Sequence, residues 1–179
     1  MQQSRSDENN IYVWDLFVRI FHWTLVVSIF LNYFYTESGE KPHEVIGYVA
    51  AGFVVARLIW GFVGSPYARF SKWFASPRTV YLYLKNYRTR EVYISHNPIA
   101  GWMMIFLMLC VLSLAVTGFM MWTDAFFGIE WVQDAHDWIA DIMMGGVALH
   151  VLGALVESYH EKRNLVASMI HGYKRKQSE

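Results

Sequence analysis

Hydrophobic residues gather into four long runs along this 179-residue chain. The runs cover about residues 14–35, 44–63, 99–122 and 136–157. A helix needs about 20 apolar residues to cross the hydrocarbon core of a bilayer. Trp and Tyr residues stand near the ends of the runs, as they do at membrane interfaces. The pattern predicts an all-α membrane protein, built as a four-helix transmembrane bundle.

The composition supports this class and excludes others. Hydrophobic residues make up 55% of the chain and charged residues 17%, against about a quarter charged in typical soluble proteins. Fifteen basic and fifteen acidic residues cancel, so the net charge gives no reason to expect nucleic-acid binding. The single cysteine, Cys110, excludes an internal disulfide framework and a cysteine-ligated metal cluster.

Charged residues divide between the two sides of the predicted bundle. The segment between the second and third runs and the C-terminal tail hold the basic residues Arg69, Lys72, Arg78, Lys85, Arg88, Arg90, Lys162, Arg163, Lys174, Arg175 and Lys176. The opposite side holds one base, Lys41, and the acids Glu37, Glu40, Glu44, Asp124, Glu130, Asp134 and Asp137. Basic loops stay in the cytoplasm, so both termini and the middle segment are expected there.

The middle segment also contains helix start signals. Ser76-Pro77 is a favourable N-cap and first-turn pair, and it predicts a short interfacial helix over about residues 77–87 that lies against lipid headgroups. Asn97-Pro98 gives a similar start for the third transmembrane helix.

Four histidines fall in or at the ends of the predicted spans, where an ionisable side chain indicates a functional site. His136 and His150 are fourteen residues apart, which places them within about 40° of one helix face and roughly 21 Å apart. His22 shares a depth with His150, near the cytoplasmic side, and His43 shares a depth with His136, near the outer side. Two levels of two histidines are what two bis-histidine haems require.

The residues restrict the type of cofactor. No Cys-x-x-Cys-His motif is present, so the cofactor is expected to be haem b, held without covalent bonds. Zinc or di-iron ligation fits poorly because there is one cysteine and no carboxylate at a matching depth. Small residues at Gly47, Gly52 and Gly145-Gly146 would let a macrocycle approach the helices. With both axial positions of each iron taken by histidine, the pair would conduct electrons.

Three further polar residues have two interpretations each. Arg19 and Arg57 either pair with haem propionates or extend their charged ends towards the membrane surface. His96 either caps a helix or contacts headgroups, or it contacts a propionate or a quinone.

Several motifs carry a resemblance to a known family. They are Val18-Arg19-Ile20-Phe21-His22-Trp23, Pro42-His43-Glu44-Val45-Ile46-Gly47-Tyr48, His96-Asn97-Pro98-Ile99-Ala100-Gly101-Trp102 and the tail Glu161 to Ile170. Together they resemble the bacterial cytochrome b561 family over about residues 12–176. The resemblance implies that His22 with His150, and His43 with His136, ligate two haems b through iron. The family includes nickel-iron hydrogenase cytochrome b subunits, partners of soluble dihaem cytochromes c, and superoxide oxidases.

The resemblance and the residues together predict a function. We expect a dihaem b-type cytochrome of the bacterial inner membrane, which carries electrons between the quinone pool and a soluble cytochrome c or other redox protein on the periplasmic face. The alternative is a superoxide:quinone oxidoreductase. The acidic outer side would repel superoxide and attract a basic protein, which favours electron transfer with a soluble partner over superoxide oxidation. Hydrogenase subunits proper carry an extra transmembrane helix, which weakens the case for a hydrogenase partner. The sequence leaves open whether the bundle forms a homodimer.

Overall fold

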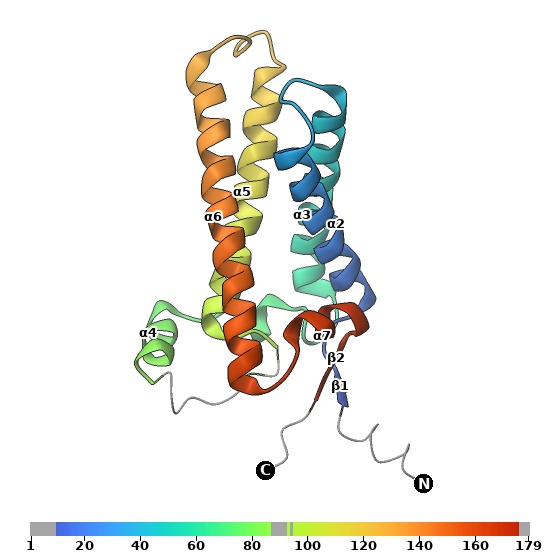
Figure 1. The fold of residues 1–179 in the computed structure, drawn as a ribbon, viewed down its shortest axis with the longest axis vertical. Coiled ribbons are helices and arrows are strands. Elements are labelled where there is room, and N and C mark those ends of the chain that lie inside the picture. Colours follow the sequence, from blue (N-terminus) through green and yellow to red (C-terminus); the bar gives the residue numbers. More distant parts are fainter. Residues whose placement is uncertain (1–9, 87–92, 94, 176–179) are drawn as a thin grey trace.

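Four long helices dominate the computed structural model, which describes residues 10–86, 93 and 95–175. They are α2 (Leu16–Phe34), α3 (Lys41–Val63), α5 (Pro98–Met121) and α6 (Glu130–Glu161). All four are long and apolar enough to cross a membrane. They stand side by side with their long axes roughly parallel (Figure 1). The predicted four-helix bundle is confirmed.

Polar side chains define where two of these helices begin. Asp15 Oδ1 accepts a hydrogen bond from the backbone N–H of Val18 at 2.9 Å and caps α2. Asn97 Oδ1 accepts one from the N–H of Ala100 at 2.8 Å and caps α5. Such caps satisfy backbone donors that the first helical turn leaves without partners.

α6 begins earlier than the apolar pattern predicts. Its 32 residues span about 48 Å, which exceeds the thickness of a bilayer core. The segment before residue 136 is polar and continues the helix, although hydropathy alone does not include it. His136 therefore lies nearly two turns inside α6, and the expectation that it opens this helix is wrong.

The helices pack as two hairpins that meet through α3 and α5. α2 packs against α3, α5 packs against α6, and α3 contacts α5. The core between them includes Phe21, Val54, Met108 and Met143. Among the described residues, α6 does not pack closely against α2 or α3. Side chains still join α6 to α2, since Tyr33 donates to Asp141 Oδ1 at 2.8 Å.

The first and last described segments of the chain lie at one end of the bundle, here called the terminal end (Figure 1). There β1 (Asn10–Tyr12) pairs antiparallel with β2 (Tyr173–Arg175), and α7 (Leu165–His171) precedes β2. This strand pair departs from the all-α expectation, because three-residue strands leave no pattern in a sequence. The opposite end, called the loop end, holds the connections over residues 35–40 and 122–129.

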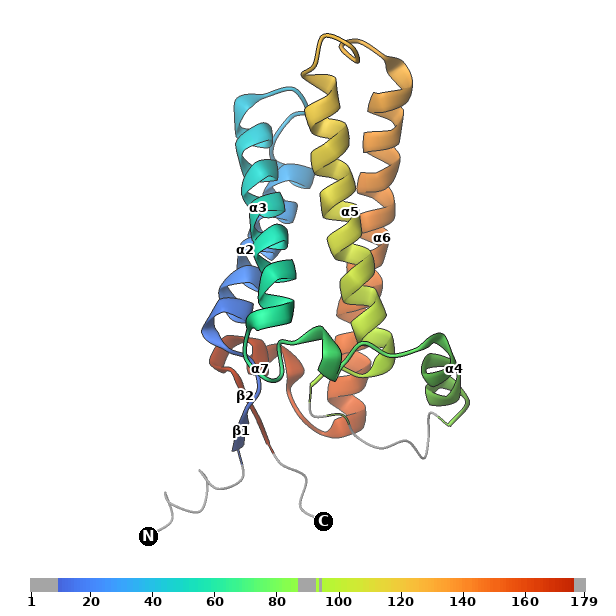
Figure 2. The ribbon, with the colours of Figure 1, turned by 180° about the vertical axis from the view of Figure 1, so that it is seen from behind.

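The middle segment lies at the terminal end and contains η1 (Phe70–Lys72) and α4 (Pro77–Lys85). α4 stands beside the foot of α5 (Figure 2). Ser76 caps α4, as expected, by accepting the N–H of Thr79 at 3.2 Å. The expected end of this helix, at about residue 87, lies outside the described residues, as do Arg88, Arg90 and Lys176.

Candidate functional site

The four candidate histidines form two pairs inside the bundle. The ring centroids of His22 on α2 and His150 on α6 are 6.4 Å apart. Those of His43 on α3 and His136 on α6 are 6.1 Å apart. The structure thus brings together the residues that the depth argument pairs. That these rings ligate haem stays a prediction.

The spacing of both pairs fits two imidazoles on opposite sides of one metal ion. An imidazole nitrogen lies about 2 Å from a metal that it ligates and about 1.1 Å from its own ring centroid, so two opposed rings have centroids about 6.2 Å apart. The observed 6.4 and 6.1 Å lie on either side of this value. Among the described residues, no three His, Cys, Asp or Glu side chains converge as a metal site. A ligand set of two histidines matches haem and does not match tetrahedral zinc.

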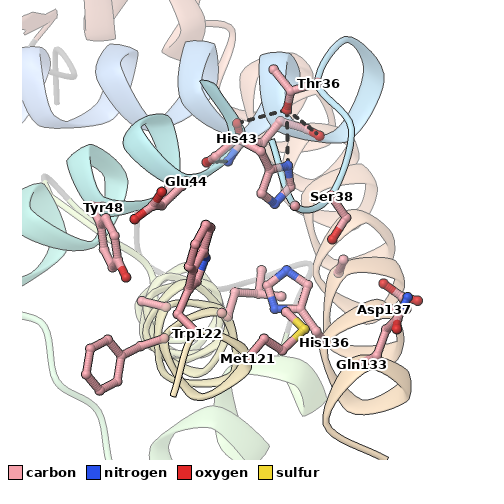
Figure 3. Close-up of a pocket in the computed structure, with 18 of the residues that line it drawn as sticks. Thr36, Ser38, His43, Glu44, Tyr48, Met121, Trp122, Gln133, His136 and Asp137 are labelled. Carbon is pink, nitrogen blue, oxygen red and sulfur yellow. Dashed lines mark hydrogen bonds between the residues drawn. The ribbon is translucent and has the colours of Figure 1, made fainter. Parts of the chain in front are cut away.

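A cavity of about 720 Å³ surrounds the loop-end pair. Its walls come from all four long helices and both loop-end connections. Figure 3 shows the rings of His43 and His136 pointing towards one another across it, with Trp122 beside them. Gly47 and Gly118 also line it, and a Cβ on Gly118 would lie 3.6 Å from the ring of His136. The cavity is of the size that proteins use for small molecules and cofactors.

Threonine hydroxyls hold the rings of the loop-end pair. Thr36 Oγ1 lies 3.1 Å from Nδ1 of His43 (Figure 3), and Thr117 Oγ1 lies 2.8 Å from Nδ1 of His136. Both bonds use Nδ1 and leave Nε2 of each ring for a metal. Partners of this kind orient the ligating histidines of metal sites.

Arg57 is a buried cation of α3. Arg57 follows His43 by fourteen residues on α3, and His150 follows His136 by fourteen residues on α6. The two helices run in the same direction (Figure 1). Arg57 therefore lies at the depth of His22 and His150. The side chain is 1% exposed. Among the described residues it makes one hydrogen bond, in which Nη2 donates to the carbonyl of Ala68 at 3.0 Å. Its buried Nε and Nη1 have no partner among the described residues. Two buried donors at this depth suit an anionic group such as a propionate.

Arg19 and His96 contact other parts of the protein, the C-terminal segment and two tryptophan rings respectively. Arg19 donates through Nη1 to the carbonyl of Ile170 at 2.8 Å, so it ties α2 to the C-terminal segment. His96 packs between the rings of Trp14 and Trp73, with centroids 4.8 and 5.0 Å away. Burial, with a smaller effect of the Lys174 charge, lowers the pKa of His96 to about 3. His96 is therefore neutral and packed between aromatic rings, and a contact with a headgroup, a propionate or a quinone stays a prediction.

The adjacent glycines of α6 differ in what they contact. A Cβ on Gly146 would lie 2.6 Å from Cε1 of Phe106, so this glycine allows α5 and α6 to approach each other. Gly145 is exposed, and a Cβ there would meet nothing within 4 Å. Gly146 therefore serves helix packing, and the expectation that Gly145 makes room for a macrocycle stays a prediction.

The sequence interpretation missed Thr36 and Thr117. A usable signal was present, because each lies near a helix end at the same depth as the histidine it contacts. Thr117 lies four residues before the end of α5, and His136 lies six residues after the start of the antiparallel α6. Asn32, whose Nδ2 donates to the carbonyl of His43 at 3.0 Å, was missed as well.

Comparisons with known proteins give the same picture. The family profile "Prokaryotic cytochrome b561" matches residues 13–172. A "Probable Ni/Fe-hydrogenase B-type cytochrome subunit" of Azotobacter vinelandii is 28% identical, over 97% of this chain and 92% of the relative. The "Probable Ni/Fe-hydrogenase 1 B-type cytochrome subunit" of Escherichia coli (strain K12) is 27% identical, over 97% and 94%.

Both alignments extend over 222 positions, more than the 179 residues of this chain, so these relatives carry residues that have no counterpart here. No solved structure matches the chain. Because the family profile spans nearly its whole length, the chain belongs to the prokaryotic cytochrome b561 family and is a multi-pass bacterial membrane protein that binds haem b and transfers electrons.

Proposed function

We propose that this protein is a dihaem b-type cytochrome that carries electrons across the bacterial inner membrane, between a soluble redox protein on the periplasmic side and the membrane quinone pool. The observation that carries the proposal is the presence of two histidine pairs with ring centroids 6.4 and 6.1 Å apart. Both pairs share α6, on which His136 and His150 lie roughly 21 Å apart along the axis.

Each group of residues has a defined task in this proposal. Bound haem b supplies a reversible one-electron couple at its iron. His22 with His150, and His43 with His136, would hold the two haem irons, and two histidines at each iron would leave no coordination site for a substrate. Arg57 lies at the depth of the terminal-end pair and has two buried donors without a partner among the described residues, which would bind a propionate. These residues would thus hold two redox centres at two depths of the bundle. Electron transfer between them needs no bond-breaking chemistry at the iron.

The charges of the two ends support a specific orientation. Arg69, Lys72 and Arg78 lie at the terminal end with the basic residues of the tail. Under the positive-inside rule this end faces the cytoplasm, and the loop end with its cavity faces the periplasm. A water-soluble partner in the periplasm would then approach the His43–His136 pair.

The loop end favours a partner with a basic surface. Glu40, Glu44, Asp137 and Asp141 line the cavity. Lys41, the one base at this end among the described residues, pairs with Glu44 at 3.0 Å. The remaining negative field would attract a basic electron-transfer protein and steer its approach.

Two other partners are separable by experiment. The relatives' names contain "Ni/Fe-hydrogenase", which makes a hydrogenase the second candidate for the soluble partner. The superoxide:quinone oxidoreductase alternative needs an anion to approach the same acidic end, and the charge distribution opposes this.

A haem count tests the proposal. In detergent-purified protein, a pyridine haemochrome assay and a redox spectrum should give two haems b per chain with bis-histidine spectra. His43→Ala and His136→Ala should each remove the same haem, and His22→Ala and His150→Ala should each remove the other. One haem or none in the wild type, or two haems in the His43→Ala protein, would overturn the proposal.

The partner is tested by the salt dependence of reduction. A basic cytochrome c should exchange electrons with the protein fastest at low salt, and the combined Glu40→Gln and Asp137→Asn changes should slow this reaction. Above about 0.15 M salt the difference should shrink, because the Debye length is then about 8 Å. An acidic redox protein serves as the control. Faster exchange with the acidic protein, or with superoxide, would contradict the choice of partner.

A further inference from the structure

The two histidine pairs differ in the hydrogen bonds of their rings. At the loop end, Nδ1 of His43 bonds Thr36 and Nδ1 of His136 bonds Thr117. At the terminal end, the buried Nδ1 of His22 has no partner among the described residues. The described part of the chain provides no hydrogen bond to the ring of His150 either. The four candidate ligands therefore divide into a bonded pair and an unbonded pair.

The direction of the two threonine bonds follows from the other contacts of each hydroxyl. Thr117 Oγ1 lies 3.0 Å from the carbonyl of Ser113, to which it donates. Thr36 Oγ1 donates to the backbone or side-chain oxygen of Asn32, at 3.3 and 3.2 Å. A hydroxyl has one hydrogen, so each oxygen is left to accept from the Nδ1–H of its histidine. Nε2 of each ring then carries the lone pair that a metal requires.

A histidine that donates its Nδ1–H is a more basic ligand. A more basic axial ligand stabilises ferric over ferrous iron and lowers the reduction potential, and hydrogen bonding around the ligands is one means by which a protein tunes a haem. Two such bonds act at the loop-end pair. None acts at the terminal-end pair within the described chain.

Nearby charges act in the same direction. The carboxylates of Glu40 and Asp137 line the loop-end cavity, and negative charge favours the ferric state. The buried cation Arg57 lies at the depth of His22 and His150, and positive charge favours the ferrous state. Hydrogen bonds and charges therefore agree on which site is the more reducing.

We propose that Thr36 and Thr117 are positioning residues that hold the reduction potential of the loop-end haem below that of the terminal-end haem. The inference rests on the proposed function, since it requires both haems. This order favours transfer of one electron from the loop-end site, where ferrous iron is oxidised, to the terminal-end site, where ferric iron is reduced. A reduced soluble partner supplies the electron and a quinone accepts it.

A redox titration of the purified holoprotein, followed by absorbance, tests the order of potentials first. His136→Ala should abolish the component of lower potential and His22→Ala the component of higher potential. If His136→Ala removes the component of higher potential, the proposal is overturned. A wild-type protein with fewer than two haems would instead refute the proposed function, so the two failures are distinguishable.

Isosteric variants test the threonines themselves. Thr36→Val and Thr117→Val should each shift the lower potential upwards, leave the higher potential in place, and weaken retention of the loop-end haem by about 10–100-fold. Thr36→Ser and Thr117→Ser keep the hydroxyl and should retain the wild-type potential. If the Val proteins keep both haems with unmoved potentials, or if the Ser proteins shift as far as the Val proteins, the tuning role is refuted. A Val protein that loses the loop-end haem is compared with its Ser counterpart, which must then retain it.

Discussion

Gly146→Ala is the substitution for which the structure gives the sharpest expectation. The added Cβ would lie 2.6 Å from Cε1 and 3.3 Å from Cδ1 of Phe106, and 3.1 Å from Cδ2 of Leu107. Carbon atoms in contact lie about 3.5–4.0 Å apart, so the Phe106 ring must move by about 1 Å. Overpacking of this kind costs about 1–3 kcal/mol. For a chain of this length, that lowers the melting temperature by roughly 2–12 °C.

Gly145→Ala provides the matched control. Its Cβ would meet nothing within 4 Å, and the residue is exposed. Thermal unfolding of both variants in one detergent, followed by circular dichroism, measures the difference. Gly146→Ala should melt lower than the wild type and Gly145→Ala should not. Combining Gly146→Ala with Phe106→Leu should recover part of the loss, because the ring atoms in the clash are removed.

The same change has a consequence for the cofactor. Gly146 lies one helical turn before His150 and nearly three turns after His136. If α6 moves away from α5 at Gly146, the His22–His150 spacing changes before the His43–His136 spacing does. We expect the Gly146→Ala protein to lose the terminal-end haem first. A melting temperature equal to that of Gly145→Ala, with both haems retained, would refute the packing argument.

Two further predictions concern charged groups outside the spans. Burial alone would raise the pKa of Asp15, but hydrogen bonds from Ser65, Trp60 and the N–H of Val18 lower it below 3.8. The stability that these bonds provide is therefore complete above pH 3.8, the pKa in the unfolded chain. It is lost as pH falls through the lower pKa of the folded protein. Asp15→Ala should cost about 1 kcal/mol of stability at pH 7, and its melting temperature should approach that of the wild type in acid. Burial lowers the pKa of Lys174 to about 8 from 10.5, so the unfolded chain binds more protons between these values and stability should rise with pH there. Lys174→Met should abolish this rise, and a wild-type melting temperature that is flat from pH 8 to 10.5 would contradict it.

The features that the sequence predicts correctly are those that leave a local or periodic signal. A membrane span is an uninterrupted apolar run, and Ser76 and Asn97 cap helices through bonds to residues three positions away. The histidine pairs could be predicted because successive spans cross the membrane in opposite directions. The number of residues between a histidine and the end of its span therefore gives its depth in the membrane. His22 and His150 are 128 residues apart, yet each depth can be counted from a helix end.

The features that it missed depend on contacts between distant segments. Tyr12 pairs with Tyr173 in the terminal-end sheet, and no local pattern marks a strand of three residues. Lys174 reads as part of a solvated basic tail, but it is 7% exposed and donates to the carbonyl of Ser95 at 2.9 Å. Its surroundings are set by how the tail folds back onto the bundle, which hydropathy does not report.

The two ends of the bundle are built for different neighbours. At the loop end, acidic side chains line the cavity that contains His43 and His136, and under the proposed function a soluble partner would bring its redox centre to this cavity. At the terminal end, Trp14, Val18 and Ala68 form a second hydrophobic core under α7 and the strand pair. Met169 of α7 and Ile11 of β1 pack against this core, so the tail that folds back onto the bundle is part of this end. An electron donor that docks at the acidic loop end would deliver electrons in the direction inferred from the threonine bonds.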